Sequence, residues 1–369
     1  MRVLVIGGAG FIGSHLVDRF LKEGFQVRVL DSLDSKIHPR GKPSYLSPEV
    51  EFIEGDLTDR KALLHALRDV DVVSHQAAYQ DYMLDFSRFL HVNAVGTALL
   101  YELIVSEHLK VKKIIVASSQ AVYGEGQYTC SEHGKFLPIP RGQQLKEGKW
   151  EVRCPDCGCE SKPALLCEEY TNPYNQYAVS KLAQEKTALG LGWLHGIPSV
   201  ALRYSITQGP RQSLFNHYSG ICRIFVSRAL GGKPLLIYED GRQTRDFVHV
   251  QDVVEANMLV LRKDEADFQA FNVGSGRSTS VLDYAHAVRE KVGRSVDLQL
   301  PGEYRRGDNR HSVSSIAKLK ALGWSPKRGL STILEDFLDW VEQTGGIPEE
   351  LQDAYSDMKE SGVVLASVH

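Results

Sequence analysis

Three glycines near the start of the chain, Gly7, Gly10 and Gly13, constrain the fold more than any other feature. They follow residues 2–6, a short apolar run that is typical of a buried parallel strand, and they open an amphipathic stretch over residues 11–21. In such a unit, the first glycine permits a tight turn, the second lets the backbone approach a pyrophosphate, and the third lets the helix lie close to the strand. The helix N-terminus then offers N–H groups to phosphate oxygens. The pattern predicts a dinucleotide site.

A second apolar run over residues 26–30 ends in Asp31, about 20 residues after the glycines, where a carboxylate can bind a ribose 2′-hydroxyl. No arginine follows Asp31, and its negative charge would repel a 2′-phosphate. The sequence therefore favours NAD over NADP.

Strand-like and helical runs alternate after Asp31. Strands are expected at residues 50–53, 71–75 and 113–117, and helices at residues 59–67 and 87–108. This alternation with short connections predicts an α/β fold, a Rossmann-type doubly wound parallel sheet. Ligands of such sheets bind beyond the carboxyl ends of the strands. Asp56, Ala77, Ala78 and Ser118 occupy such ends, although for Asp56 turn chemistry is an equal alternative.

The chain is expected to divide into two domains with one insert. Residues 1–203 would form the NAD-binding domain, interrupted at 125–170 by a Cys-rich insert that lacks a sustained period. A helix at 172–195 and a strand at 197–203 would complete that domain. Residues 204–345 would form mainly a smaller α/β substrate lobe, with some segments at about 235–273 returning to the first domain, and 346–369 would be a polar tail.

The composition is that of an ordinary soluble enzyme. The 369 residues are 43% hydrophobic and 24% charged with a net charge of −3, so no basic excess exists to hold nucleic acid or an anionic membrane. No run of 18 apolar residues occurs, and a first strand at residue 2 leaves no room for a signal peptide. We expect a cytoplasmic protein without nucleic-acid or membrane partners.

A tyrosine and a lysine, Tyr177 and Lys181, lie four residues apart in the helix that follows the insert. This spacing places both side chains on one helix face. A phenol of ordinary pKa about 10 is a poor base at neutral pH, but a nearby ammonium favours the phenolate. Ser119 ends the strand at 113–117, where its hydroxyl could bind a substrate oxygen and share a proton with Tyr177. The alternatives are a surface Tyr–Lys pair and a serine that caps the strand end.

Taken together, these features resemble the extended short-chain dehydrogenases/reductases, and among them the NAD-dependent nucleotide-sugar epimerase/dehydratase family. The matching positions, in chain order, are 7–13, Asp31, 55–57, 75–78, Asn93, 118–124, Tyr177, Lys181 and 245–250. The resemblance covers residues 1–340.

The resemblance implies that Tyr177 is the catalytic base, Lys181 its partner and Ser119 the second hydroxyl. It implies tightly bound NAD in contact with Gly7, Gly10, Phe11, Ile12, Gly13, Asp31, Asp56, Leu57, Ala77, Ala78, Asn93, Ser118, Tyr177 and Lys181. It implies a nucleoside-diphosphate sugar in contact with Ser119, Gln120, Arg211, Asn216, Arg245, Arg305 and Asp308. A homodimer formed through the helices at 87–108 and 172–195 is usual in this family.

Within the family, the residues after Ser119 distinguish the reactions. The 4,6-dehydratases carry an Asp-Glu pair there, whereas this chain has Gln120 and Ala121, which cannot transfer protons in that way. A 4-epimerase needs only a base, a hydroxyl and a tightly held cofactor. We therefore expect C4 epimerisation of a dTDP- or UDP-hexose through a transient 4-keto sugar. The alternatives are another NAD-dependent reaction, such as UDP-uronate decarboxylation, dehydration or net oxidation, and, more distantly, a non-catalytic dinucleotide sensor.

One segment departs from the family. Ile206 stands where an amide usually contacts the diphosphate or the sugar. Ser205, Thr207 or Gln208 could supply the missing polar contact.

Five of the six cysteines lie between Cys130 and Cys167, and a Cys-x-x-His and a Cys-x-x-Cys pair stand out among them. Cys130, His133, Cys154 and Cys157 could close a tetrahedral Cys₃His site, which predicts a structural zinc in a zinc-ribbon-like insert. Cys159 or Cys167 could replace His133, and buried or reactive thiols are the alternative to a metal. The insert also resembles that of the subgroup assigned as dTDP-L-rhamnose 4-epimerases.

Overall fold

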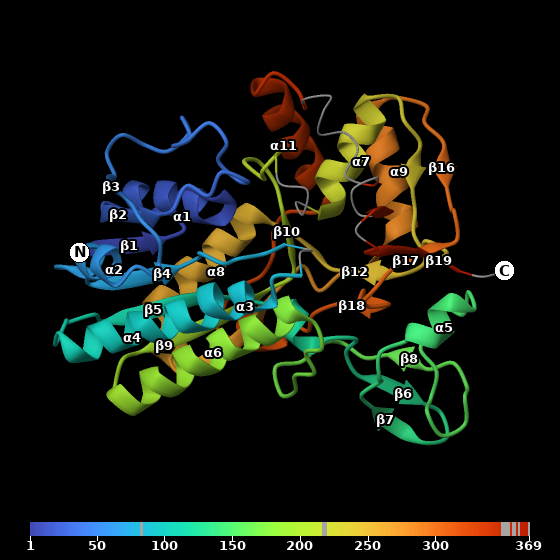
Figure 1. Ribbon diagram of the computed structural model, residues 1–369, viewed down its shortest axis with the longest axis horizontal. Coiled ribbons are helices and arrows are strands. Elements are labelled where there is room, and N and C mark those ends of the chain that lie inside the picture. Colours follow the sequence, from blue (N-terminus) through green and yellow to red (C-terminus); the bar gives the residue numbers. More distant parts are fainter. Residues whose placement is uncertain (82–83, 216–219, 348–354, 356–358, 361, 368–369) are drawn as a thin grey trace.

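A seven-stranded parallel sheet forms the centre of the larger domain (Figure 1). The computed structural model describes residues 1–81, 84–215, 220–347, 355, 359–360 and 362–367. The sheet has the order β14-β9-β5-β4-β1-β2-β3. Strands β1, β2 and β3 therefore extend the sheet toward one edge and β4, β5, β9 and β14 toward the other, so the strand order switches between β1 and β4. The strands are β1 Arg2–Ile6, β2 Gln26–Asp31, β3 Glu51–Glu54, β4 Val72–His75, β5 Lys113–Ser119, β9 Ser199–Tyr204 and β14 Gln269–Val273. The doubly wound α/β fold is confirmed.

Strand β1 shows why this sheet is covered on both faces. Its side chains alternate, so Val3 and Val5 pack with helices α1 (Phe11–Lys22) and α8 (Val250–Arg262), while Leu4 and Ile6 pack with the opposite layer. That opposite layer contains α2 (Arg60–Leu67), α4 (Gly96–Ser106) and α6 (Gln176–His195). Because both faces are covered, β1 and the middle of β5 are continuous apolar runs rather than alternating ones.

The helix expected at residues 87–108 is interrupted by a wider turn. It consists of α3 (Phe86–Leu90), a π-helical turn (His91–Val95) and α4. Among the described residues, the continuous run Phe86–Ser106 is the one segment long and apolar enough to cross a membrane. It packs beside α6 (Figure 1) and buries Leu100, Leu103 and Ile104 in the core. These contacts are those of a core helix.

The smaller lobe has its own apolar core, formed mainly by α7 (Gly220–Leu230), α9 (Val281–Val292) and α11 (Leu330–Gln343). Its short strand pairings are β10 (Ile206–Gln208) with β13 (Phe247–His249), β11 (Leu235–Leu236) with β16 (Leu298–Gln299), β12 (Thr244–Arg245) with β15 (Thr279–Ser280) and β18 (His311–Ser312), and β17 (Glu303–Arg305) with β19 (Val364–Ala366). The remaining short helices are the 3₁₀ turns Gln120–Tyr123 and Asp264–Ala266 and the α-helix α10 (Ala317–Ala321).

Two segments within the range of about 235–273 lie with the larger domain. Strand β11 pairs with β16 inside the smaller lobe, whereas α8 packs against α1 and β14 joins the central sheet. The return therefore consists of α8 and β14.

The end of the chain is more firmly attached than a polar tail at 346–369 suggests. Strand β19 pairs antiparallel with β17, and Val364 is 4% exposed. The Tyr355 hydroxyl also donates to Glu303 at 2.7 Å. These contacts place the described part of the tail on the smaller lobe.

The Cys-rich insert is a small separate unit beside the smaller lobe (Figure 1). Strand β6 (Tyr128–Cys130) pairs antiparallel with β7 (Gly134–Phe136) and β8 (Lys162–Pro163), and α5 (Gly142–Lys146) lies between β7 and β8 in the chain.

Candidate active site

The glycine turn is shaped to hold a pyrophosphate close to the backbone. Gly7 has φ of +79°, which favours glycine, and a Cβ on Gly13 would lie 2.0 Å from the Gly7 carbonyl oxygen. No side chain from the described residues caps α1 at Gly10. The first turn of α1 is therefore free of competing side-chain caps, as an anion site at a helix N-terminus requires.

Asp31 stands at the end of β2 beside this turn. Its Oδ2 accepts a hydrogen bond from the Ala9 N–H at 2.9 Å, and its Oδ1 accepts one from the Leu33 N–H at 3.0 Å. The carboxylate is 9% exposed. These contacts hold its side chain at the edge where a dinucleotide ribose would lie, so the glycine turn and Asp31 together fit NAD.

A cavity of about 1010 Å³ runs between the carboxyl ends of the strands and the smaller lobe. Its lining includes most of the expected catalytic, nicotinamide-side and substrate residues, namely Phe11, Ile12, Ala78, Ser118, Ser119, Gln120, Tyr177, Lys181, Arg211, Arg245, Arg305 and Asp308. The other expected residues surround the cavity without lining it, namely Gly7, Gly10, Gly13, Asp31, Asp56, Leu57, Ala77 and Asn93. Asn216 lies outside the described residues.

Three of these surrounding residues shape the loops instead. The Asp56 carboxylate is exposed and accepts hydrogen bonds from both the N–H and the hydroxyl of Thr58 at 2.7 Å, which is turn chemistry. The buried Leu57 occupies the space that the absence of a side chain on Gly96 leaves open. The Ala77 backbone lies where a side chain on Gly7 would have to go.

Tyr177 and Ser119 face the cavity as a hydrogen-bonded pair. Ser119 is the last residue of β5, and Tyr177 is the second residue of α6. Asn175 caps this helix, because its Oδ1 accepts a hydrogen bond from the Ala178 N–H at 2.8 Å. Burial raises the pKa of Tyr177 to about 12, and the hydrogen bond with Ser119 acts in the opposite direction. Burial is therefore the larger effect, and the hydroxyl of Ser119 is the group that favours the phenolate.

Lys181 lies one turn further along α6 and is 1% exposed. Its Nζ donates to Oε1 of Gln184 at 2.5 Å, and burial lowers its pKa to about 7, against the attraction of Glu185. The Gln184 amide in turn donates to Nε2 of His75 at 3.1 Å. The hydrogen bonds from Lys181 to Gln184 and from Gln184 to His75 thus connect α6 to the end of β4.

Asn93 lies in the π-helical turn and is fully buried. Its Oδ1 accepts from the Tyr79 N–H at 2.7 Å, and its Nδ2 donates to the Ser180 hydroxyl at 2.9 Å. Asn93 thus reaches α6 from the π-helical turn, and such turns occur frequently at functional sites. Its two hydrogen bonds connect the loop after β4 to α6.

Glu185 and Arg203 support the site from beneath, and sequence reasoning missed them. Both guanidinium nitrogens Nε and Nη2 of Arg203 donate to the Glu185 carboxylate, at 2.9 and 2.7 Å, and both side chains are buried. The Ser118 hydroxyl, expected at the cofactor, donates to Glu185 at 2.7 Å. The signal was present, because Glu185 follows Lys181 by four residues and so lies on the same helix face.

The expected phosphate-binding arginines line the opposite wall of the cavity. Arg245 donates to the carbonyl oxygens of Asn309 at 2.8 Å and Arg310 at 3.1 Å, and Arg305 pairs with Asp308 at 2.7 Å. Arg211, in contrast, pairs with Asp18 of α1 at 2.7 Å. The cavity therefore carries a hydroxyl–phenol–ammonium group on one wall and cationic groups on the other.

Two of the three polar side chains considered as substitutes beside Ile206 lie at the cavity. Ser205 and Thr207 line the cavity together with Ile206. Gln208 is fully buried and accepts from the Tyr284 hydroxyl at 2.9 Å. Gln208 therefore has a structural partner inside the smaller lobe.

The insert brings Cys130, His133, Cys154 and Cys157 together, with all four ligand atoms within 4.8 Å of one another. The Sγ of Cys130 lies 3.6 Å from the Sγ of Cys157 and 3.7 Å from Nδ1 of His133, and the Cys154 Sγ lies 3.6 Å from the same nitrogen. Tetrahedral zinc with bonds of about 2.3 Å to sulfur places two sulfurs about 3.8 Å apart. The donor set and its spacing fit zinc.

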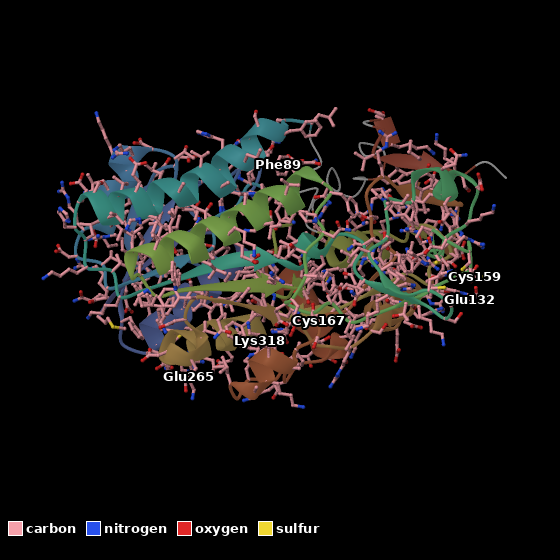
Figure 2. All side chains as sticks on the ribbon, turned by 90° about the horizontal axis from the view of Figure 1, so that it is seen from below. Phe89, Glu132, Cys159, Cys167, Glu265 and Lys318 are labelled. Carbon is pink, nitrogen blue, oxygen red and sulfur yellow. The ribbon has the colours of Figure 1, made fainter. Side chains whose placement is uncertain are left out.

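The two remaining cysteines of the insert are not part of this cluster. Figure 2 shows Cys167 far from the tip of the insert, on the side of Lys318, whereas Cys159 lies near Glu132. Cys159 is exposed, and Cys167 donates to the Leu165 carbonyl at 3.2 Å. Neither replaces His133 in the group.

Known proteins resemble this chain over nearly its whole length. The model of the NAD dependent epimerase/dehydratase family matches residues 3–142 and 158–274. The dTDP-L-rhamnose 4-epimerase of Burkholderia thailandensis is 33% identical over 350 residues, which cover 93% of this chain and 95% of that protein.

Two solved structures share the fold. The UDP-glucose 4-epimerase of Thermus thermophilus in complex with NAD is 32% identical with a TM-score of 0.71, and the match covers 92% of this chain and 98% of that one. The UDP-glucuronic acid 4-epimerase of Bacillus cereus in complex with UDP-glucuronic acid and NAD is 27% identical with a TM-score of 0.76, covering 93% and 100%. The chain belongs to the NAD dependent epimerase/dehydratase family, and its relatives place it with the isomerases of that family that epimerise nucleotide sugars at position 4.

Proposed function

We propose that this protein epimerises the C4 carbon of a dTDP- or UDP-hexose, with Tyr177 as the base. The observation that carries the proposal is the convergence of Ser119, Tyr177 and Lys181 on the cavity whose other wall holds Arg245 and Arg305. The first group suits proton transfer at a sugar hydroxyl, and the second suits a diphosphate. A dehydratase would need further acid and base groups after Ser119, where the chain has an amide and a methyl group.

The chain's own residues divide the proton chemistry among them. Ser119 hydrogen-bonds the sugar 4-hydroxyl and the Tyr177 oxygen, so that the proton can pass to Tyr177 as the 4-keto group forms. Lys181 lies one turn from Tyr177 and, in its protonated form, holds a positive charge near the phenolate, while Gln184 accepts a hydrogen bond from its Nζ. NAD held by the glycine turn, Asp31 and Lys181 would supply reversible hydride transfer at C4 of the sugar. Tyr177 then returns its proton to the new hydroxyl.

The cofactor would be held by the glycine turn, Asp31 and Lys181. The relative from Thermus thermophilus was solved in complex with NAD, which supports the same cofactor here. A cycle that consumes no net NAD needs a cofactor that stays bound through turnover.

The proposed substrate is a dTDP- or UDP-sugar. The relative from Burkholderia thailandensis acts, by its name, on dTDP-L-rhamnose, and the Cys-rich insert resembles that subgroup. The decisive experiment incubates the purified protein, without added cofactor, with dTDP- and UDP-sugars and follows the sugar protons by NMR. A C4-inverted product of identical mass supports the proposal, and a product lighter by water or carbon dioxide refutes it.

The Tyr177→Phe variant tests the base. It removes the acidic proton but keeps the ring, so turnover should fall by a factor of about 10² to 10⁴ while NAD remains bound. Turnover is read by NMR and NAD by its absorbance after denaturation. Unchanged turnover would exclude Tyr177 as the base.

The Cys₃His group would hold a structural zinc that connects the turn at residues 130–133 to the turn at residues 154–157. Its three thiolates and one imidazole are a typical closed zinc set, and the reaction requires no metal position open to substrate. Elemental analysis should find one zinc per chain.

Two further proposals concern the protein as a whole. Exposed apolar side chains on neighbouring helices, among them Leu90 and Val95 on the α3–α4 run and Val179 on α6, support a homodimer in which these helices pair with a second copy. Light scattering after gel filtration tests the dimer. A cytoplasmic location, without nucleic-acid or membrane partners, is consistent with an enzyme of nucleotide-sugar metabolism.

A further inference from the structure

The insert packs behind the segment that carries part of the cavity's cationic wall. Arg305, Gly307, Asp308 and Asn309 line the cavity. The next residue, Arg310, is fully buried and does not line it. No residue from 125 to 170 lines the cavity either, and the structure describes all of them. The insert can therefore influence the cavity only indirectly, for example through the residues of the segment 305–309 that line it.

Arg310 connects the insert to the smaller lobe. Its Nη1 contacts Glu239 and Asp240 of the smaller lobe, each at 2.7 Å, and its Nε donates to Glu151 of the insert at 3.0 Å. The second oxygen of Glu151 contacts Nε2 of His311 at 3.2 Å. Hydrogen bonds with His311 and then with Arg310 lower the pKa of Glu151 to about 2, so this group is a carboxylate at neutral pH.

A second contact comes from Arg141, which is 7% exposed. Its Nη2 donates to the Asp308 carbonyl oxygen at 3.2 Å, and its Nε donates to the buried Glu125 carboxylate at 3.2 Å. Glu125 also accepts from the backbone N–H of Arg310. The peptide from Asp308 to His311 is thus bonded to the insert through its backbone as well as through side chains.

The same peptide holds the two arginines that face the cavity. Arg245 donates to the carbonyl oxygens of Asn309 and Arg310, and both Nε and Nη2 of Arg305 donate to the Asp308 carboxylate, at 2.9 and 2.7 Å. A shift of this peptide would therefore move both guanidinium groups. Their spacing matters because bidentate binding of a phosphate depends on fixed donor geometry.

We propose that Glu151 and Arg141 are positioning residues, which fix the peptide 308–311 so that Arg245 and Arg305 can bind the diphosphate of the nucleotide sugar. The inference rests on the proposed function and extends it to the insert. The family match skips residues 143–157, which include Glu151, and ends before Arg310, whereas Arg141 lies at the edge of the matched range.

The consequence is specific to one ligand. NAD would be held by the glycine turn, Asp31 and Lys181 in the larger domain, none of which contacts the insert network. Weakening the network should therefore reduce the affinity for nucleoside diphosphates and raise KM for the sugar nucleotide, and should leave kcat and NAD content unchanged. Loss of one charge-assisted hydrogen-bonding group corresponds to a change of about tenfold.

The test compares Glu151→Gln with a matched control in the same insert. Glu160 is exposed and pairs with Arg153 at 3.1 Å, so Glu160→Gln removes the same charge without touching the smaller lobe. Calorimetry with dTDP and UDP measures affinity, and kinetics with the converted sugar nucleotide measure KM and kcat. Glu151→Gln should weaken the tighter-binding diphosphate about tenfold, Glu151→Asp should restore most of that affinity, and Glu160→Gln should match the wild type.

Arg141→Lys gives a second test, because it keeps the charge beside Glu125 but loses the planar donors that reach the Asp308 carbonyl. The same loss of diphosphate affinity is expected. Equal affinities in the wild type and both variants would overturn the proposal, as would a fall in kcat or NAD content larger than the loss of affinity. Loss of the fold in both variants would overturn it too, because the network would then serve folding.

The arms separate this inference from the proposed function. A wild type that binds dTDP or UDP but epimerises no sugar would refute the reaction and leave the binding comparison valid. A wild type that binds neither diphosphate would overturn the inference.

Discussion

Burial of Lys181 should make the wild type less stable to unfolding than a variant that lacks this amino group, and the difference in the free energy of unfolding should depend on pH. Lys181 is 1% exposed, and burial lowers its pKa from 10.5 to about 7. Between these two values the unfolded chain holds a proton that the folded chain has lost, so unfolding takes up a proton. The free energy of unfolding should therefore rise with pH in this window, by about 1.4 kcal/mol per pH unit from this group.

The perturbation is Lys181→Met, which keeps an unbranched apolar chain and removes the titrating group. The variant lacks the desolvation cost, whose size is about 5 kcal/mol at pH 6 and about 2 kcal/mol at pH 9. It also leaves Gln184 without its donor, which costs about 1–3 kcal/mol at either pH. The variant's gain in stability over the wild type should therefore be about 3 kcal/mol smaller at pH 9 than at pH 6.

Urea unfolding of the NAD-free proteins at both pH values measures this difference. Lys186→Met is the matched control, because Lys186 is exposed on the same helix, and its difference from the wild type should not change with pH. Lys181→Met should also abolish turnover. If the Lys181→Met difference were the same at pH 6 and pH 9, the desolvation argument would be refuted.

Three further variants test the site and its supports. Gly13→Ala places a Cβ 2.0 Å from the Gly7 carbonyl oxygen, so bound NAD measured by absorbance should fall to a small fraction of the wild-type content. Glu185→Gln leaves the buried Arg203 without its counter-charge and should lower the free energy of unfolding by about 3–5 kcal/mol in urea titrations; a loss below 1 kcal/mol would contradict the pairing. Cys154→Ser should lose zinc in elemental analysis, whereas Cys167→Ser should keep it, and the reverse result would overturn the ligand set.

The central sheet and the catalytic helix could be predicted because their signals are local. Continuous apolar runs identify strands that are buried on both faces, and the turn glycines and the four-residue spacing of Tyr177 and Lys181 depend only on neighbouring residues. The π-helical turn at His91–Val95 has no such signal, since the apolar period continues through it. The sequence therefore indicated one long helix there.

The electrostatics of the site depended on tertiary burial and were harder to predict. A lysine one turn from a tyrosine favours the phenolate in water, but here burial dominates and raises the pKa of Tyr177 to about 12. The same holds for the tail, whose polar composition indicates a loose end although β19 completes a pair with β17. Composition reports average polarity, whereas a short edge strand needs only a few apolar residues, such as Val364, to dock.

The insert shows most clearly which parts of a site the sequence can reveal. Its Cys₃His group could be predicted because two ligands that grip one ion from a tight turn are typically separated by two residues. Ion pairs carry no such constraint, and Glu151 and Arg310 are separated by 159 residues. Either residue alone has the pattern of an ordinary surface charge, yet Arg310 is fully buried and joins three carboxylates from two parts of the chain. Because an unpaired guanidinium cannot be buried at low cost, the insert and the smaller lobe must be placed together for the peptide 308–311 to keep its position. The role of the insert at the active site thus follows from its charges, and the cysteines account only for its shape.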